Sequence, residues 1–102
     1  MPASYTLDSG AEIHRQFPTT FWIPPQEERE NLRQGDLVKL IFRIEFGDEV
    51  HVERMWVRVV EVTSEFYVGA VDNDPYCTED IRSGMRVQFQ ADHVIQIDKA
   101  VA

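Results

Sequence analysis

Hydrophobic and polar residues alternate along most of the chain after Gly35, which is the pattern of strands with one buried face. Turn-forming residues divide this part of the chain into separate runs. The pattern predicts five strands, at residues 36–46, 50–63, 66–72, 85–90 and 94–98, with a one-turn connection at 91–93 before the last. In the first strand the expected core face consists of Val38, Leu40, Phe42, Ile44 and Phe46.

The second of these strands is the longest, and its apolar face changes phase along its length. Met55, Val57 and Val59 lie on one face, but the next apolar residues are Val60 and Val62. Such a phase change is typical of a β-bulge or a sharp bend. We therefore expect this strand to bend rather than to stay flat.

The turn after the long strand predicts its pairing with the following strand. If residues 64–65 form a two-residue hairpin loop, Trp56 falls opposite Asn73 and Val60 falls opposite Gly69. The absence of a side chain at Gly69 would then have a packing reason.

The N-terminal third predicts short helices. Residues 8–17 can form the first, with Asp8 or Ser9 as its N-cap. Residues 26–33 can form the second, with acidic residues at its start and Gly35 as a C-cap after its end.

Two further N-terminal segments carry no helical pattern. Residues 1–7 are expected to be frayed or loosely docked. Residues 19–23, Thr-Thr-Phe-Trp-Ile, are β-prone and apolar, so we expect a strand or an extended arm that packs across the core and ends at Pro24.

These elements predict a mainly β (α+β) fold, a small SH3-like, five-stranded, strongly bent barrel or half-barrel with short N-terminal helical segments. The expected single domain spans residues 1–102, with an N-terminal arm at 1–34 and a β-barrel core at 35–98. An open α+β sheet with the N-terminal helix on one face is the alternative.

Composition narrows the functional classes. The formal net charge is −8 over 102 residues, which disfavours nucleic acid as a partner because phosphate backbones are repelled. The chain has no apolar run long enough for a membrane span and no secretory signal, so we expect a cytoplasmic protein without a membrane partner. With one cysteine, Cys77, no intrachain disulfide is possible.

Several short stretches resemble the YegJ-like bacterial family, a domain of unknown function. They are Gly35-Asp-Leu-Val-Lys-Leu-Ile-Phe42, Glu53-Arg-Met-Trp-Val57, Asp72-Asn-Asp-Pro75, Gly84 with Val87 and Phe89, and His93-Val94. The resemblance covers about Phe21 to Asp98 and is most specific in the Glu-Arg-Met-Trp-Val and Asn-Asp-Pro pieces. The resemblance implies a bacterial origin and a single-domain architecture. It also implies that some family members occur next to ankyrin-type repeats in the same chain, and this favours a role in interaction over catalysis. It implies no catalytic residues.

The least ordinary feature of the sequence is a tryptophan between two arginines on a strand face that should meet water. Arg54, Trp56 and Arg58 share this face, and guanidinium groups beside an indole suit a carboxylate-bearing or aromatic ligand, or a protein hot spot. The structural alternative is a Trp that covers the barrel, shielded by arginine stems and packed under the arm at residues 21–23.

An acidic loop follows the third predicted strand. Asp72, Asn73 and Asp74 precede a proline and Tyr76, and the spacing departs from that of calcium loops, so a structural turn is the favoured reading and no metal is predicted.

A thiol–imidazole pair of Cys77 and His93 is the catalytic alternative in this region. Acidic neighbours disfavour a Cys77 thiolate, and His93 is interpreted as a turn residue that bonds backbone. The three histidines show no metal-ligand spacing, and no cofactor is predicted.

The sequence therefore favours a non-enzymatic protein- or peptide-binding module, of an adaptor or immunity-like kind, over an enzyme. Its candidate binding residues are Arg54, Trp56, Arg58, Asp72, Asn73, Asp74, Tyr76 and His93. The alternative is a small hydrolase or metal-dependent enzyme that uses the Asp72–Cys77 loop and His93. A homodimer, with a second copy covering Trp56, is also compatible with the sequence.

Overall fold

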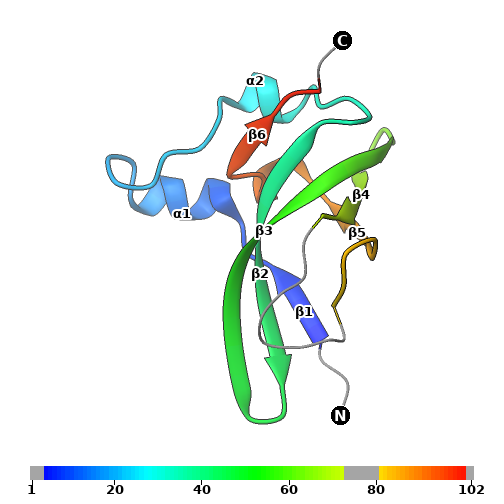
Figure 1. Ribbon diagram of the computed structural model, residues 1–102. Helices are drawn as coiled ribbons and strands as arrows, with labels where there is room; N and C mark the ends of the chain where they lie inside the picture. The colour runs from blue at the N-terminus through cyan, green and yellow to red at the C-terminus, as the bar shows by residue number, and fades with distance from the viewer. Residues whose placement is uncertain (1–3, 73–80, 101–102) are drawn as a thin grey trace.

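The computed structural model describes residues 4–72 and 81–100, and within them six strands form one antiparallel sheet (Figure 1). The strand order is β1-β2-β3-β4-β5, and β6 pairs with β2 on the edge that β1 also uses. The strands are β1 (Ser4–Leu7), β2 (Leu37–Phe46), β3 (Glu49–Val62), β4 (Tyr67–Val71), β5 (Arg86–Phe89) and β6 (Gln96–Asp98). The helices are α1 (Gly10–Gln16), α2 (Gln26–Arg29) and the 3-10 turn η1 (Ala91–His93).

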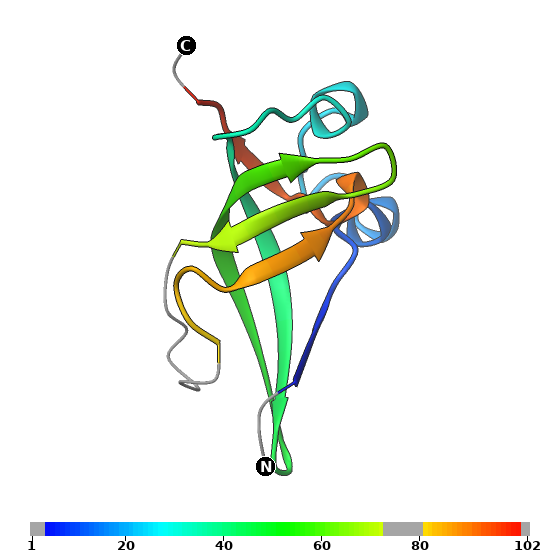
Figure 2. The same cartoon turned by 90° about the vertical axis from the view of Figure 1, so that its right-hand side faces the viewer.

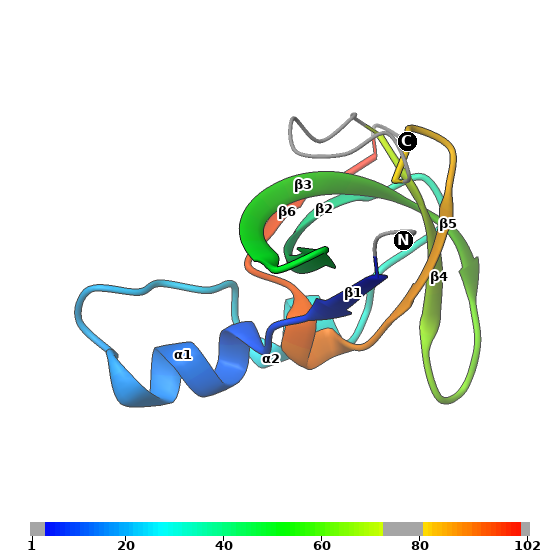
Figure 3. The same cartoon turned by 90° about the horizontal axis from the view of Figure 1, so that it is seen from below.

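The sheet is curled rather than flat. Figure 3 shows β3 arching over the fold, with β4 and β5 on the side away from α1. The predicted mainly β fold is confirmed in its half-barrel form, and the one-turn connection predicted at residues 91–93 is η1, which links β5 to β6. In Figure 2, η1 lies between the end of β5 and α1.

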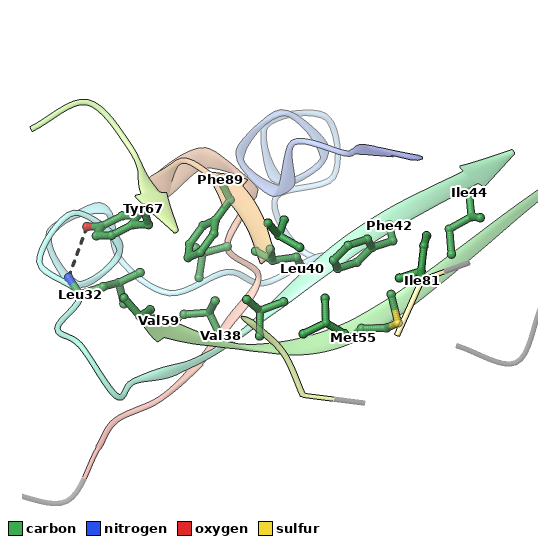
Figure 4. Close-up of a cluster of buried hydrophobic side chains, with 14 residues drawn as sticks. Leu32, Val38, Leu40, Phe42, Ile44, Met55, Val59, Tyr67, Ile81 and Phe89 are labelled. Atoms are coloured by element: carbon green, nitrogen blue, oxygen red, sulfur yellow. Dashed lines mark hydrogen bonds between the residues drawn. The ribbon is translucent and has the colours of Figure 1, made fainter. Parts of the chain in front are cut away.

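The alternation in the sequence correctly predicts the core. Val38, Leu40, Phe42 and Ile44 are fully buried on β2, whereas Phe46 near the hairpin end is partly exposed. One buried cluster fills the concave side of the sheet (Figure 4). Its members are Leu32, Val38, Leu40, Phe42, Ile44, Met55, Val57, Val59, Tyr67, Val71, Ile81, Val87, Phe89 and Val94.

The predicted bulge lies in β3. Val59 pairs with Gly69 and Glu61 pairs with Val68, so Val60 is the extra residue. The register predicted from a straight hairpin is wrong beyond this point, because the bulge moves each later pair by one residue. Gly69 faces Val59 rather than Val60.

Close packing explains the glycine at position 69, as the sequence predicted, but the neighbouring side chains are Val57 and Phe89 rather than Val60. A Cβ atom there would lie 2.2 Å from Cγ1 of Val57 and 3.2 Å from Cε1 of Phe89. The close approach of β3, β4 and β5 around this point therefore requires glycine.

The N-terminus departs from the prediction at its first residues. Ser4–Leu7, expected to be loosely docked, forms β1 and pairs with residues 42–45 of β2. Past its end, the Asp8 backbone N–H donates to the Ile41 carbonyl, and the Asp8 carboxylate accepts two hydrogen bonds from the Arg43 guanidinium, at 3.0 and 2.8 Å. This carboxylate raises the pKa of Arg43.

The first predicted helix is α1, and Ser9 is its N-cap, with Oγ accepting a hydrogen bond from Glu12 N at 3.1 Å. The following segment, residues 19–23, forms turns and irregular backbone rather than a strand. Ile23 at its end is buried against Ile41 and Ile95 in a second small cluster. The expected strand or extended segment is therefore wrong, and Ile23 is the one apolar residue of residues 19–23 that is buried; we call these residues the arm.

The second predicted helix, α2, ends at Arg29 instead of Arg33. Gly35 is therefore not its C-cap; it lies in the turn before β2 with φ +98°, a conformation that glycine adopts readily. The turn is stabilised by Asp36, a buried carboxylate that accepts hydrogen bonds from Arg33 N and Ala100 N at 2.8 Å each. This side chain joins the start of β2 to the C-terminal end of the described chain.

Arg29 is the other buried charged residue of the described core. Its Nε donates to the Pro24 carbonyl at 2.9 Å and its Nη1 to the Ala91 carbonyl at 3.0 Å. The Arg29 carbonyl accepts a hydrogen bond from the hydroxyl of Tyr67, which also receives the backbone N–H of Leu32 (Figure 4). These bonds fasten α2 to η1 and to β4.

Candidate functional site

The predicted Arg-Trp-Arg face lies on the outer, convex side of the sheet. Met55, Val57 and Val59 point into the core, so the alternate residues of β3 point outward. Register places side chains of neighbouring strands beside them. We call this surface the outer face and define it by Lys39 on β2, by Arg54, Trp56 and Arg58 on β3, by Asp72 after β4 and by Gln96 on β6.

Trp56 is covered by a cation from the neighbouring strand. Lys39 is its direct cross-strand partner, and the Lys39 ammonium lies 4.8 Å from the centroid of the Trp56 ring. This is the geometry of a cation–π contact. The sequence predicted arginines beside the indole, and the cation over its face is instead a lysine that sequence spacing does not bring near.

Arg54 lies over a second aromatic ring. Its guanidinium carbon lies 5.6 Å from the centroid of the Phe21 ring, which belongs to the arm after α1. The arm is held there from two sides: the Phe21 N–H donates to Phe17 O at 2.9 Å, and His14 Nδ1 lies 2.6 Å from Phe21 O. Because a carbonyl only accepts, His14 Nδ1 carries the proton and donates.

Arg58 serves a different purpose from Arg54. Its Nη1 donates to the Gly35 carbonyl at 3.2 Å, and its Nη2 lies 4.0 Å from Asp72 Oδ2. Asp72 in turn sits opposite Trp56, with its backbone N–H donating to Trp56 O at 2.9 Å. The structure therefore brings four predicted site residues together: Arg54, Trp56, Arg58 and Asp72.

A groove of about 380 Å³ runs between the arm and the outer face. Its lining residues are Thr20, Phe21, Trp22, Lys39, Arg54, Ile95 and Gln96. Trp22 is 70% exposed, the largest exposed fraction among the large hydrophobic residues that the structure describes. Figure 1 shows α1 and β6 on the same side of the fold, away from β4 and β5.

The charges in the groove are unbalanced. Lys39 and Arg54 are its cations, and no carboxylate is among its lining residues. Within residues 4–72 and 81–100, neither side chain forms an ion pair with an acidic residue. In a chain of net charge −8, this is a local concentration of positive charge next to aromatic surface.

His93 lies in η1, apart from the lining of the groove. Its Nδ1 accepts the backbone N–H of Gln90 at 2.9 Å, which confirms the interpretation of His93 as a turn residue that bonds backbone. Burial lowers the pKa of His93, and the nearby Asp92 carboxylate opposes this. The Nδ1 lone pair is thus engaged in a structural hydrogen bond.

The remaining predicted site residues, Asn73, Asp74 and Tyr76, and the thiol of Cys77 lie outside the described residues. In the part of the chain that the structure describes, no group of three or more His, Cys, Asp or Glu side chains converges as metal ligands. No helix in that part is long and apolar enough to cross a bilayer.

Comparison with protein families gives one match. A family model described as "Uncharacterized protein conserved in bacteria (DUF2314)" matches residues 8–97. The chain belongs to this family. No curated protein and no solved structure gives a significant match. The match begins at Asp8, so the matched region includes α1, the arm and the strands from β2 onward, whereas β1 precedes it.

For this DUF2314 domain, sequence reasoning missed Lys39, Phe21 and Trp22 as site residues. In the alternating pattern of β2, Lys39 is an ordinary solvent-side residue. Only the β2–β3 register places it over Trp56. The sequence offers residues 21–23 as a cover for Trp56, whereas in the structure the Phe21 ring lies under the Arg54 guanidinium. Exposed aromatics beside cations form surfaces suited to non-covalent binding.

Proposed function

We propose that this domain is a non-enzymatic binding module that recognises a protein or peptide through the outer face around Arg54 and Trp56. The observation that carries the proposal is the groove, in which two cations without acidic partners among the described residues border exposed aromatic surface. Aromatic and arginine side chains are enriched at protein interfaces.

The local rigidity of this surface supports the same function. The arm is fixed by the hydrogen bonds to Phe21, and Ile23 is buried just beyond it. Trp22, between these two anchors, is exposed without being on a long free loop. A surface ordered in advance loses less conformational entropy on binding, which favours affinity. An adaptor-type role, in which the domain only holds a partner, requires no more than this.

The test is affinity capture from a lysate of the source organism, read by mass spectrometry. The wild type is compared with the Arg54→Glu, Arg58→Glu variant and with a control, Arg15→Glu, Arg33→Glu, that has the same net charge. Arg15 is exposed on α1, and Arg33 is exposed in the turn before β2. We expect a protein that is captured by the wild type and the control and lost only with the first variant.

Circular dichroism of all three proteins accompanies the capture, because Arg58 also bonds Gly35. Equal capture by folded wild-type, variant and control proteins would contradict the assignment of the partner to the outer face. Absence of any protein partner would remove the proposed function.

A further inference from the structure

Two features of the groove decide what it can hold. Lys39 and Arg54 lie on adjacent strands in a diagonal relation, because Lys39 pairs with Trp56 and Arg54 is two residues away on the same strand face. Side chains in this relation start about 7–8 Å apart, within reach of one ligand group for residues as long as these. Each cation already covers one aromatic ring, so both are held over the surface rather than extended into water.

We infer that the groove binds an acidic peptide segment of a partner protein, with a side-chain carboxylate between Lys39 and Arg54. The inference rests on the proposed function and names the chemistry of the ligand. Arginine binds a carboxylate through two parallel N–H groups, and lysine binds it as a point charge. Both hydrogen bonds join ionised groups, so they are stronger than hydrogen bonds between neutral groups.

The rest of the groove requires an apolar neighbour of that carboxylate. Ile95 contributes to its lining, and Trp22 supplies a large exposed aromatic surface at one wall. An aliphatic or aromatic side chain next to the acidic one would bury this surface. Gln96, which pairs with Lys39 across β2 and β6, offers amide groups to the peptide backbone.

Charge complementarity also sets an upper limit on the ligand's charge. The two groove cations attract a single carboxylate at short range, but the net charge of −8 repels a polyanion as it approaches. A peptide with one or two acidic residues among apolar ones satisfies both conditions. A nucleic acid strand, with one charge per nucleotide, does not.

The test starts from a phage-displayed library of random peptides fused at their C-termini, so that every peptide carboxylate available is a side chain. Selection uses the full chain. We expect enriched peptides that contain Asp or Glu next to an apolar residue. An enriched peptide is then synthesised with acetylated and amidated ends, alongside its analogue with Glu→Gln or Asp→Asn. We expect the amide analogue to bind about 10- to 100-fold more weakly, the effect of losing a charge-assisted bond.

The protein variants localise the carboxylate. Lys39→Met and Arg54→Met, which keep the apolar stems, should each weaken the acidic peptide about tenfold or more and leave the amide analogue unaffected. Arg15→Met, on the exposed surface of α1, should change neither. The comparison of the acidic peptide with its amide analogue uses the wild-type protein. It therefore tests whether a carboxylate is bound even if a protein variant folds poorly.

Three results would overturn the inference. They are selection of no peptide, equal binding of the acid and its amide analogue, and displacement of the peptide by a single-stranded oligonucleotide with steep salt dependence. The first two leave the binding module intact if lysate capture still depends on Arg54. Failure of that capture, with acidic peptides still bound at the groove, would instead remove the proposed function while leaving the chemistry assigned to the groove in place.

Discussion

Lys39 and Trp56 face each other across β2 and β3, with the Lys39 ammonium 4.8 Å from the centre of the indole ring. The contact joins the first strand of the long hairpin to the residue that the sequence singled out. It also places the Lys39 cation at the edge of the groove, next to the arm. The same pair therefore belongs both to the packing of the sheet and to the proposed binding surface.

The energy of this pair is measurable by a double-mutant cycle. Lys39→Met and Trp56→Leu, alone and together, should give a coupling free energy of about 0.5–1 kcal/mol, the usual size for a partly exposed cation–π contact. Urea unfolding of the four proteins provides the free energies. Additive effects of the two substitutions would show that the contact does not form in solution.

The close packing around Gly69 predicts a second coupling. Gly69→Ala should lower the free energy of unfolding by about 1–3 kcal/mol, because the added methyl group overlaps Val57 Cγ1. In the Val57→Ala background the same substitution should cost much less, since that atom is gone. Chemical denaturation of both single variants and the double variant tests this, and an equal cost in both backgrounds would contradict the packing.

Two patterns explain why most strands were predictable from the sequence. The alternation of Val38, Leu40, Phe42 and Ile44 places these four side chains on one face, which is the buried one, and the phase change after Val59 located the bulge. What the pattern did not give was the effect of the bulge on register. A one-residue shift changes which residues of β3 and β4 face each other. The residues of the hairpin turn do not indicate this shift, because it arises further along β3.

The candidate site was predictable only in part, for a related reason. Arg54, Trp56 and Arg58 are neighbours on one strand, so their common face follows from sequence alone. Lys39 and Phe21 join them through contacts between distant segments. Ser4–Leu7 was missed because a four-residue strand with a half-buried face has little pattern, and it exists because β2 extends beyond β6 and leaves its edge open.

His93 predicts a pH dependence of stability. Its folded-state pKa is lowered from 6.5, so the unfolded chain binds the proton more readily and protonation favours unfolding. The contribution is fully present above about pH 6.5 and is lost as the pH falls from there toward the lowered pKa. Protonation of Nδ1 also removes the acceptor of the Gln90 N–H.

The measurement is urea unfolding between pH 7.5 and 5, with His93→Asn as the comparison. The Asn side chain offers an oxygen to the Gln90 N–H and does not titrate. Wild-type stability should therefore fall more steeply below pH 6.5 than that of the variant. Parallel profiles would show that His93 does not contribute.

Arg29 carries a stability prediction that the sequence alone did not indicate, since it lies in a run of mixed charges that reads as a solvated helix face. Arg29→Met leaves the buried Pro24 carbonyl and the partly buried Ala91 carbonyl without their donor, and we expect the free energy of unfolding to fall by about 2–3 kcal/mol. Arg33→Met, at an exposed position, should cost less than about 0.5 kcal/mol. Thermal and urea unfolding of the two variants compare them, and similar costs would contradict the assigned role of Arg29.

Site-specific photo-crosslinking in the source cells tests the central claim, that the groove beside Arg54 is a binding surface. A photoreactive phenylalanine replaces Trp22, at the groove wall, or Val62, which is exposed but does not line the groove. We predict a crosslinked protein at position 22 that disappears with Arg54→Glu, and none of the same mass at position 62. A crosslink at position 62 alone, or one at position 22 that persists with Arg54→Glu, would contradict the account.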